Sequence, residues 1–214
     1  MKRERVFRGA FYVTGEALTA LGSTLSPKAG LGVSPPTAVP FAIYNGTGFK
    51  FSVMCFVVSS LMIVLQFILR GKNSRKRDLL QLPLNVMFSV FLEWFDTLFT
   101  LHPMLLWQKL LVMALSIVCT GSGVFLMVNM HLVPNPPDGL TQVLSEVLNK
   151  ELGITKNLFD FTCVAIAVLV DILLNGRLLS IGLGTVVAMV FIGRTVSLLN
   201  HIFRGKLLAL AGLK

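Results

Sequence analysis

The sequence is short of charged residues: Asp, Glu, Lys and Arg make up 14% of its 214 residues, against about 25% in soluble domains. Cysteine is also scarce. The three cysteines lie inside apolar stretches at spacings that match no zinc or redox motif, which excludes a disulfide-rich scaffold. The chain instead has 54% hydrophobic residues and a mean hydropathy of +0.78. This composition excludes a disordered chain and predicts a polytopic integral membrane protein.

Catalytic motifs are missing as well. The sequence contains no HExxH, GxSxG, P-loop or CxxC motif, and no nucleophile–base set that helical spacing would assemble. We therefore expect no enzyme activity, no cofactor and no metal site.

Several apolar segments are long enough to cross the roughly 30 Å of hydrocarbon in a bilayer. Hydrocarbon offers the backbone no hydrogen-bond partners, and the apolar runs do not alternate as the strands of a membrane barrel do. We therefore expect an all-α protein with six transmembrane helices. They are placed at residues 6–25, 51–69, 79–101, 110–137, 158–174 and 178–203.

The basic residues predict the orientation of the chain. Lys and Arg collect near the N-terminus, in the loop at residues 70–77, before the fifth span and after the sixth. Cytoplasmic loops are enriched in this way, so both termini are expected in the cytoplasm. The formal net charge of +9 is thus explained by orientation, and a nucleic-acid partner is not expected.

An internal repeat is visible at about 100 residues. Gly22 aligns with Gly123, and Ser34-Pro35-Pro36-Thr37 aligns with Asn135-Pro136-Pro137-Asp138. Each half would hold three spans, and because three is odd the halves would have opposite orientations, as in many transporters. The predicted halves are residues 1–103 and 104–214.

Each Pro-Pro segment predicts the start of a short helix, because proline suits the first helical turn and Ser34 and Asn135 are good N-cap residues. Two interpretations stay open. The short helices lie flat at the membrane surfaces, or they re-enter the protein and point their positive N-terminal ends at an anionic solute. On the second, Ser34, Thr37, Asn135 and Asp138 are the candidate substrate-binding residues, although Asp138 also suits capping its own helix or binding a cation.

A charge near the centre of a span costs about 2.5–3.5 kcal/mol. The ionisable residues that stand out for this reason are Glu16, Glu93, Asp96 and Arg194. An ion pair between Arg194 and Glu93 or Asp96 is the structural interpretation. The functional interpretation makes Glu16 or Glu93 a protonatable group for proton coupling.

Three segments carry a resemblance to a known family: Gly-Leu-Gly-Val-Ser-Pro-Pro-Thr at 30–37, His-Leu-Val-Pro-Asn-Pro-Pro-Asp-Gly at 131–139, and Leu-Leu-Ser-Ile-Gly-Leu-Gly-Thr at 178–185. Together they resemble the YczE/YitT-type bacterial integral membrane proteins. That family tends to have a Leu-Gly-x-x-Pro-x-Asp pattern in both halves, and here Thr37 stands where the first Asp would be. The resemblance implies six helices, the bacterial plasma membrane, and a transport or accessory role.

Taken together, the sequence predicts a transporter or permease for a small anionic solute, linked to protons, with its site between the two Pro-Pro elements. A non-transporting membrane scaffold or accessory subunit is the alternative. The expected partners are the lipid bilayer and a small-molecule solute, and a homodimer is left open.

Overall fold

The computed structural model describes residues 2–71, 76–100 and 105–213, and in these the predicted all-α class is confirmed: they form helices and no strand. The helices are α1 (Lys2–Ala29), α2 (Pro35–Thr47), α3 (Phe51–Arg70), α4 (Gln81–Leu98), α5 (Leu106–Asn129), α6 (Pro136–Leu148), α7 (Leu152–Val170) and α8 (Leu183–Leu210). A 3-10 turn, η2 (Lys76–Leu80), precedes α4, and a π-helical turn, η3 (Asp171–Asn175), follows α7. The predicted boundary between residues 103 and 104 lies outside the described residues.

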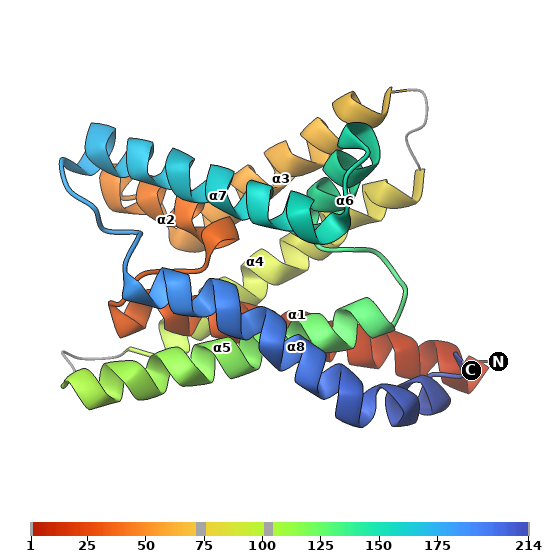
Figure 1. Ribbon diagram of the computed structural model, residues 1–214. Coiled ribbons are helices and arrows are strands. Elements are labelled where there is room, and N and C mark those ends of the chain that lie inside the picture. The colour runs from red at the N-terminus through yellow and green to blue at the C-terminus, as the bar shows by residue number, and fades with distance from the viewer. Residues whose placement is uncertain (1, 72–75, 101–104, 214) are drawn as a thin grey trace.

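Within the described residues, four helices are long and apolar enough to cross a membrane: α3, α5, α7 continued through η3, and α8. This finding agrees with the predicted membrane protein. The long helices run back and forth along one axis, and both chain ends lie at the same end of the molecule (Figure 1). The two ends are in contact there, because a Cβ atom on Gly212 would lie 2.8 Å from the Glu4 side chain.

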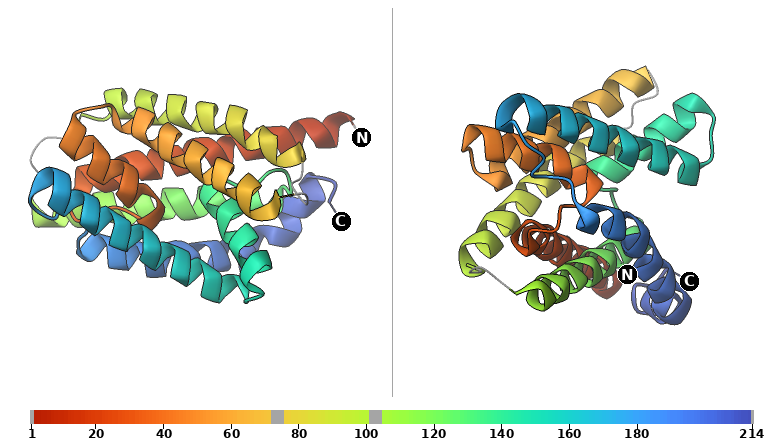
Figure 2. Two further views of the ribbon diagram at one scale, coloured as in Figure 1. Left: turned by 90° about the horizontal axis from the view of Figure 1, so that it is seen from above. Right: turned by 60° about the vertical axis from the view of Figure 1, so that its left-hand side comes forward.

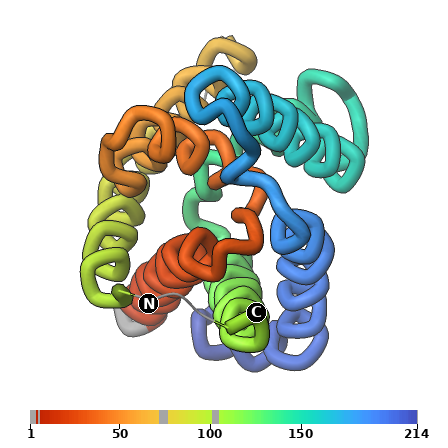
Figure 3. The backbone as a smooth tube through the Cα atoms, turned by 90° about the vertical axis from the view of Figure 1, so that its left-hand side faces the viewer, coloured from red at the N-terminus to blue at the C-terminus, as the bar shows by residue number. Residues whose placement is uncertain are grey.

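The helices form two groups. The first is a row in the order α4, α1, α5, α8, in which each helix packs on its neighbours (Figure 3). In the second group, α2 and α6 each pack against both α3 and α7, so the two short helices lie between two long apolar ones (Figures 1 and 2). The contact of α3 with α4 joins the two groups.

The contact between α1 and α5 is built on two glycines. A Cβ atom on Gly22 would overlap Thr120 Oγ1, and one on Gly123 would overlap Thr19 Oγ1 in the same way. Both glycines therefore let the helix backbones approach closely, as small residues do in membrane helix pairs. Because the earlier residue of α1 meets the later residue of α5, the two helices run antiparallel.

Both short helices begin at the predicted prolines, with Ser34 and Asn135 at the N-cap positions. Neither N-cap side chain bonds to its helix backbone, so the side-chain capping that we expected is wrong. The Ser34 hydroxyl lies 2.8 Å from the Thr37 hydroxyl instead, and the Asn135 amide points to the Met127 sulfur at 3.7 Å. Proline at both N1 and N2 leaves fewer unpaired N–H groups for a cap to satisfy.

Candidate functional site

One face of α1 carries Arg8, Tyr12 and Glu16, each one helical turn from the next. Arg8 donates a hydrogen bond to the carbonyl oxygen of Met130 at 2.8 Å, and the Tyr12 hydroxyl donates to that of Val133 at 2.9 Å. This polar face therefore lies against the loop that joins α5 to α6 and contains the second Pro-Pro segment.

Glu16 is the most enclosed member of that face, with 2% of its surface exposed. Its Oε2 atom is buried and has no hydrogen-bond partner, and the same holds for the Nε atom of Arg8. Buried polar atoms are nearly always hydrogen-bonded, so an unpartnered one calls for an explanation. Tyr12 lies between the two on this face of α1.

Side chains from three other elements hold the second Pro-Pro loop in place. In addition to Arg8 and Tyr12 of α1, Arg77 of η2 donates to the carbonyl oxygens of His131 and Leu132. Gln66 of α3 donates to that of Pro136 at 3.0 Å. The start of α6, in the second half of the chain, is thus positioned by side chains from the first half.

Asp138 lies in the first turn of α6, where its charge faces Lys156 of α7. The Lys156 Nζ atom is 4.0 Å from Asp138 and 2.9 Å from Asp160. Lys156 therefore offsets the charges of two carboxylates near the beginning of α6. Asp138 adds a negative charge at this helix N-terminus, as its position in the sequence suggested.

The first Pro-Pro segment is held mainly by backbone bonds. Val33 donates to the carbonyl oxygen of Ser180 at 3.0 Å, and Gly184 donates to that of Leu31 at 2.7 Å. Ser180 is itself fixed by Asp171, which is completely buried and accepts bonds from the backbone N–H and the hydroxyl of Ser180. This first loop is thereby tied to the start of α8.

The two sets of predicted binding residues are held separately. Ser34 and Thr37 bond to one another at the start of α2, whereas Asn135 and Asp138 contact α5 and α7. What the two short helices share is apolar, because Val39 of α2 packs against a cluster that contains Leu140 of α6. In the described part of the chain, no polar contact joins the two sets.

The predicted ion pair of Arg194 with Glu93 or Asp96 is wrong. Glu93 pairs with Lys50, and Asp96 pairs with Lys28 at 2.6 Å. Arg194 instead lies over the Phe191 ring at 5.5 Å. The physical reason is the order of the row: α4 and α8 stand at its two ends, separated by α1 and α5.

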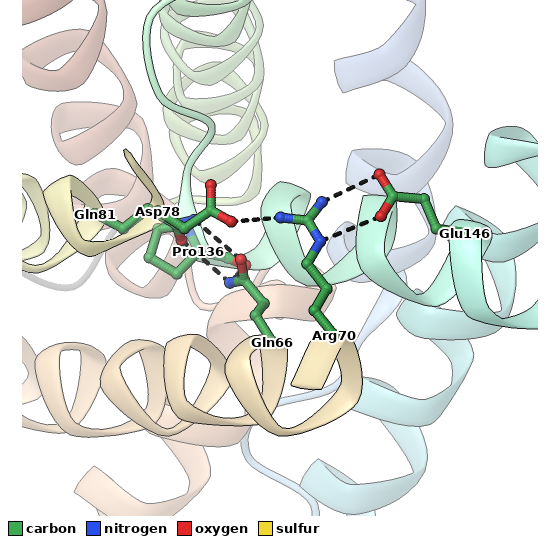
Figure 4. Close-up of polar contacts among 6 residues, drawn as sticks. All are labelled: Gln66, Arg70, Asp78, Gln81, Pro136 and Glu146. Carbon is green, nitrogen blue, oxygen red and sulfur yellow. Dashed lines mark hydrogen bonds and ion pairs between the residues drawn. The ribbon is translucent and has the colours of Figure 1, made fainter. Parts of the chain in front are cut away.

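A polar network between α3, η2 and α6 was missed at the level of sequence (Figure 4). Arg70, with 8% of its side chain exposed, binds both carboxylate oxygens of Glu146 at 3.2 and 3.1 Å and also pairs with Asp78. Gln66 and Gln81 exchange two amide hydrogen bonds beside it, at 3.1 and 2.9 Å. In the sequence, this network is indicated by a glutamine within each of two apolar runs. Arg70 is grouped there with the basic residues of the loop at 70–77.

Comparison with known proteins adds a family. A family model matches residues 6–201. The chain belongs to the family of unknown function DUF6198. No curated protein and no solved structure matches the chain. The DUF6198 model carries no function, so the resemblance to YczE/YitT-type proteins stays a prediction.

Proposed function

We propose that this DUF6198 protein is a membrane transporter that moves a small anionic solute together with a proton. The observation that carries the proposal is Glu16, a carboxylate with 2% exposure whose Oε2 atom has no hydrogen-bond partner. Intramembrane ionisable residues are expensive and typically serve function. A proton removes the buried charge, and a donor group on the solute supplies the hydrogen bond that this oxygen lacks.

The anionic character of the solute is supported by Arg8. Its Nε–H is a buried donor without an acceptor, and it lies on the same face of α1 as Glu16. The start of α6 adds the positive end of a helix dipole. Lys156 offsets the charge of Asp138 there. A solute carboxylate or phosphate at this place would meet a guanidinium and a helix N-terminus.

An inverted repeat with six spans is part of the proposal. It is supported by the reciprocal packing of Gly22 on Thr120 and of Gly123 on Thr19, which a two-fold axis between antiparallel α1 and α5 would produce. The order of a long helix, a 13-residue helix and two long helices occurs twice. Both short helices lie between α3 and α7, which favours the re-entrant interpretation over a position flat on the membrane surface.

In this mechanism, movement of α6 relative to α3 gives access to the Glu16 face. The Arg70–Glu146 pair holds α6 closed at the end of the molecule where both termini lie (Figure 4). Solute bound at Arg8 and a proton on Glu16 would be released together when this end opens. Release of only one of them would leave an uncompensated charge buried, on Arg8 or on Glu16. The plasma membrane and the cytoplasmic position of the termini belong to the same proposal.

The second candidate, a non-transporting scaffold or accessory subunit, is favoured by one observation. The α1–α5 contact at the centre of the row is closed by glycines, and Glu93 and Asp96 are both paired with lysines. A scaffold has no need for a solute at Glu16.

Ligand-dependent thermal stability separates the two candidates, since a ligand stabilises the state that it binds. The detergent-purified protein would be heated with acetate, lactate, succinate, glutamate or phosphate. A transporter predicts that at least one anion raises the Tm of the wild type and that the rise disappears in Arg8→Ala. If none of these anions raises the Tm, the scaffold is favoured.

A further inference from the structure

The face of α4 that meets α3 carries a polar residue every four positions: Gln81, Asn85, Ser89 and Glu93. Three of the four bond across to α3. Gln81 pairs with Gln66, the Asn85 amide donates to the carbonyl oxygen of Phe56 at 3.0 Å, and Glu93 accepts from Ser52 at 2.6 Å. Ser89 is the exception, and its buried Oγ atom has no hydrogen-bond partner.

Beside Ser89, α3 and α4 leave an open groove of about 360 Å³ between them. The groove walls are the apolar side chains of Val53, Phe56, Val86 and Val90. Val53, Val86 and Val90 are 44%, 48% and 60% exposed, so the groove opens to the outside of the helix bundle. For a span such as α3, that outside is the lipid hydrocarbon.

One end of the groove is polar. Lys50 and Glu93 form an ion pair there, and Ser52 bonds to the same carboxylate. Lys50 lies at the N-cap of α3, the position at which a membrane helix meets the headgroup region. The groove therefore has apolar walls along its length, and one end carries one positive and one negative charge.

We propose that this groove binds an aminophospholipid, with one acyl chain along the valines and the headgroup at the Lys50–Glu93 pair. The phosphate would pair with Lys50 and the primary ammonium with Glu93, so both charges are matched. Ser89 lines the same groove one helical turn from Glu93, about 6 Å along α4. A choline headgroup has no N–H to donate to Glu93, and an anionic headgroup leaves that carboxylate unmatched.

The proposal requires that α3 and α4 face lipid and does not depend on transport. The experiment is native mass spectrometry of the full chain in detergent, titrated with phosphatidylethanolamine, phosphatidylcholine or phosphatidylglycerol that carry the same oleoyl chains. We expect phosphatidylethanolamine to bind about tenfold more tightly than the other two, the ratio that one charge-assisted hydrogen bond provides.

Two variants test the binding of the lipid headgroup and of the acyl chain separately. Lys50→Ala with Glu93→Ala should abolish the preference among headgroups. Val90→Trp, at an exposed position, should fill the groove and weaken all three lipids. Lys28→Ala with Asp96→Ala removes an ion pair outside the groove and should keep the preference. Equal binding of the three lipids to the wild type, or a preference that survives in the Lys50/Glu93 variant, would overturn the proposal.

Discussion

Arg70 of α3 binds Glu146 of α6 through two parallel hydrogen bonds, from Nε at 3.2 Å and from Nη2 at 3.1 Å (Figure 4). The guanidinium is buried whereas the Glu146 carboxylate is half exposed, at 8% and 50% of the side chain. Removing Arg70 would therefore leave the enclosed Asp78 carboxylate without its cation, whereas removing Glu146 would not.

Arg70→Ala should destabilise the protein by about 3 kcal/mol, because it strands the buried Asp78 carboxylate. Glu146→Gln should cost about 1 kcal/mol or less, since solvent replaces a half-exposed partner. Unfolding in mixed micelles with increasing dodecyl sulfate measures both. Equal costs for the two variants would show that Asp78 does not depend on Arg70.

Gly22→Ala should destabilise the α1–α5 pair by about 1–3 kcal/mol, because the added methyl group overlaps Thr120 and the backbone of Ser116. Gly193→Ala on α8 is the matched control. Nothing lies within 4 Å of a Cβ atom at Gly193, so alanine there should be neutral or slightly stabilising through its higher helix propensity. The same unfolding titration compares the two. If Gly22→Ala were as stable as Gly193→Ala, the close helix contact would be refuted.

The number of spans is tested by single cysteines at Thr47, before α3, and at Lys150, before α7. Both positions are exposed, and the native Cys55, Cys119 and Cys163 are buried, so background labelling should be low. If α4 spans as well as α3 and α5, three crossings separate the two sites. A membrane-impermeant thiol reagent on intact cells should then label Thr47→Cys alone, before lysis.

If only the four most apolar helices span, α3 and α5 are the two crossings between these positions. Thr47→Cys and Lys150→Cys would then lie on the same side and label alike. That outcome would contradict the six-span inverted repeat.

Local features of the fold were predictable from sequence, and contacts between helices were not. Apolar runs long enough to span a membrane predicted the long helices, and each Pro-Pro pair marked the start of a short one at Pro35 and Pro136. Both signals depend on residues that are neighbours in the chain. The partners of Glu93 and Asp96 depend instead on which helices are adjacent, and the row order puts lysines rather than Arg194 beside them.

The candidate site was predictable in part for the same reason. Glu16 stood out because a carboxylate within an apolar span has a high energetic cost. Its neighbours Arg8 and Tyr12 follow from helical spacing, yet their importance comes from the Met130 and Val133 carbonyl oxygens, more than 100 positions away. No spacing rule within one helix connects α1 to the α5–α6 loop.

Uptake into proteoliposomes tests the central claim most directly. Vesicles containing the wild type or Glu16→Gln would receive radiolabelled acetate, lactate, succinate, glutamate or phosphate, with and without an inward proton gradient. The proposed transporter should accumulate at least one of these anions above protein-free vesicles, faster with the gradient, and Glu16→Gln should lose the effect of the gradient. Accumulation of none of the five by folded wild type, or a gradient effect unchanged in Glu16→Gln, would contradict it.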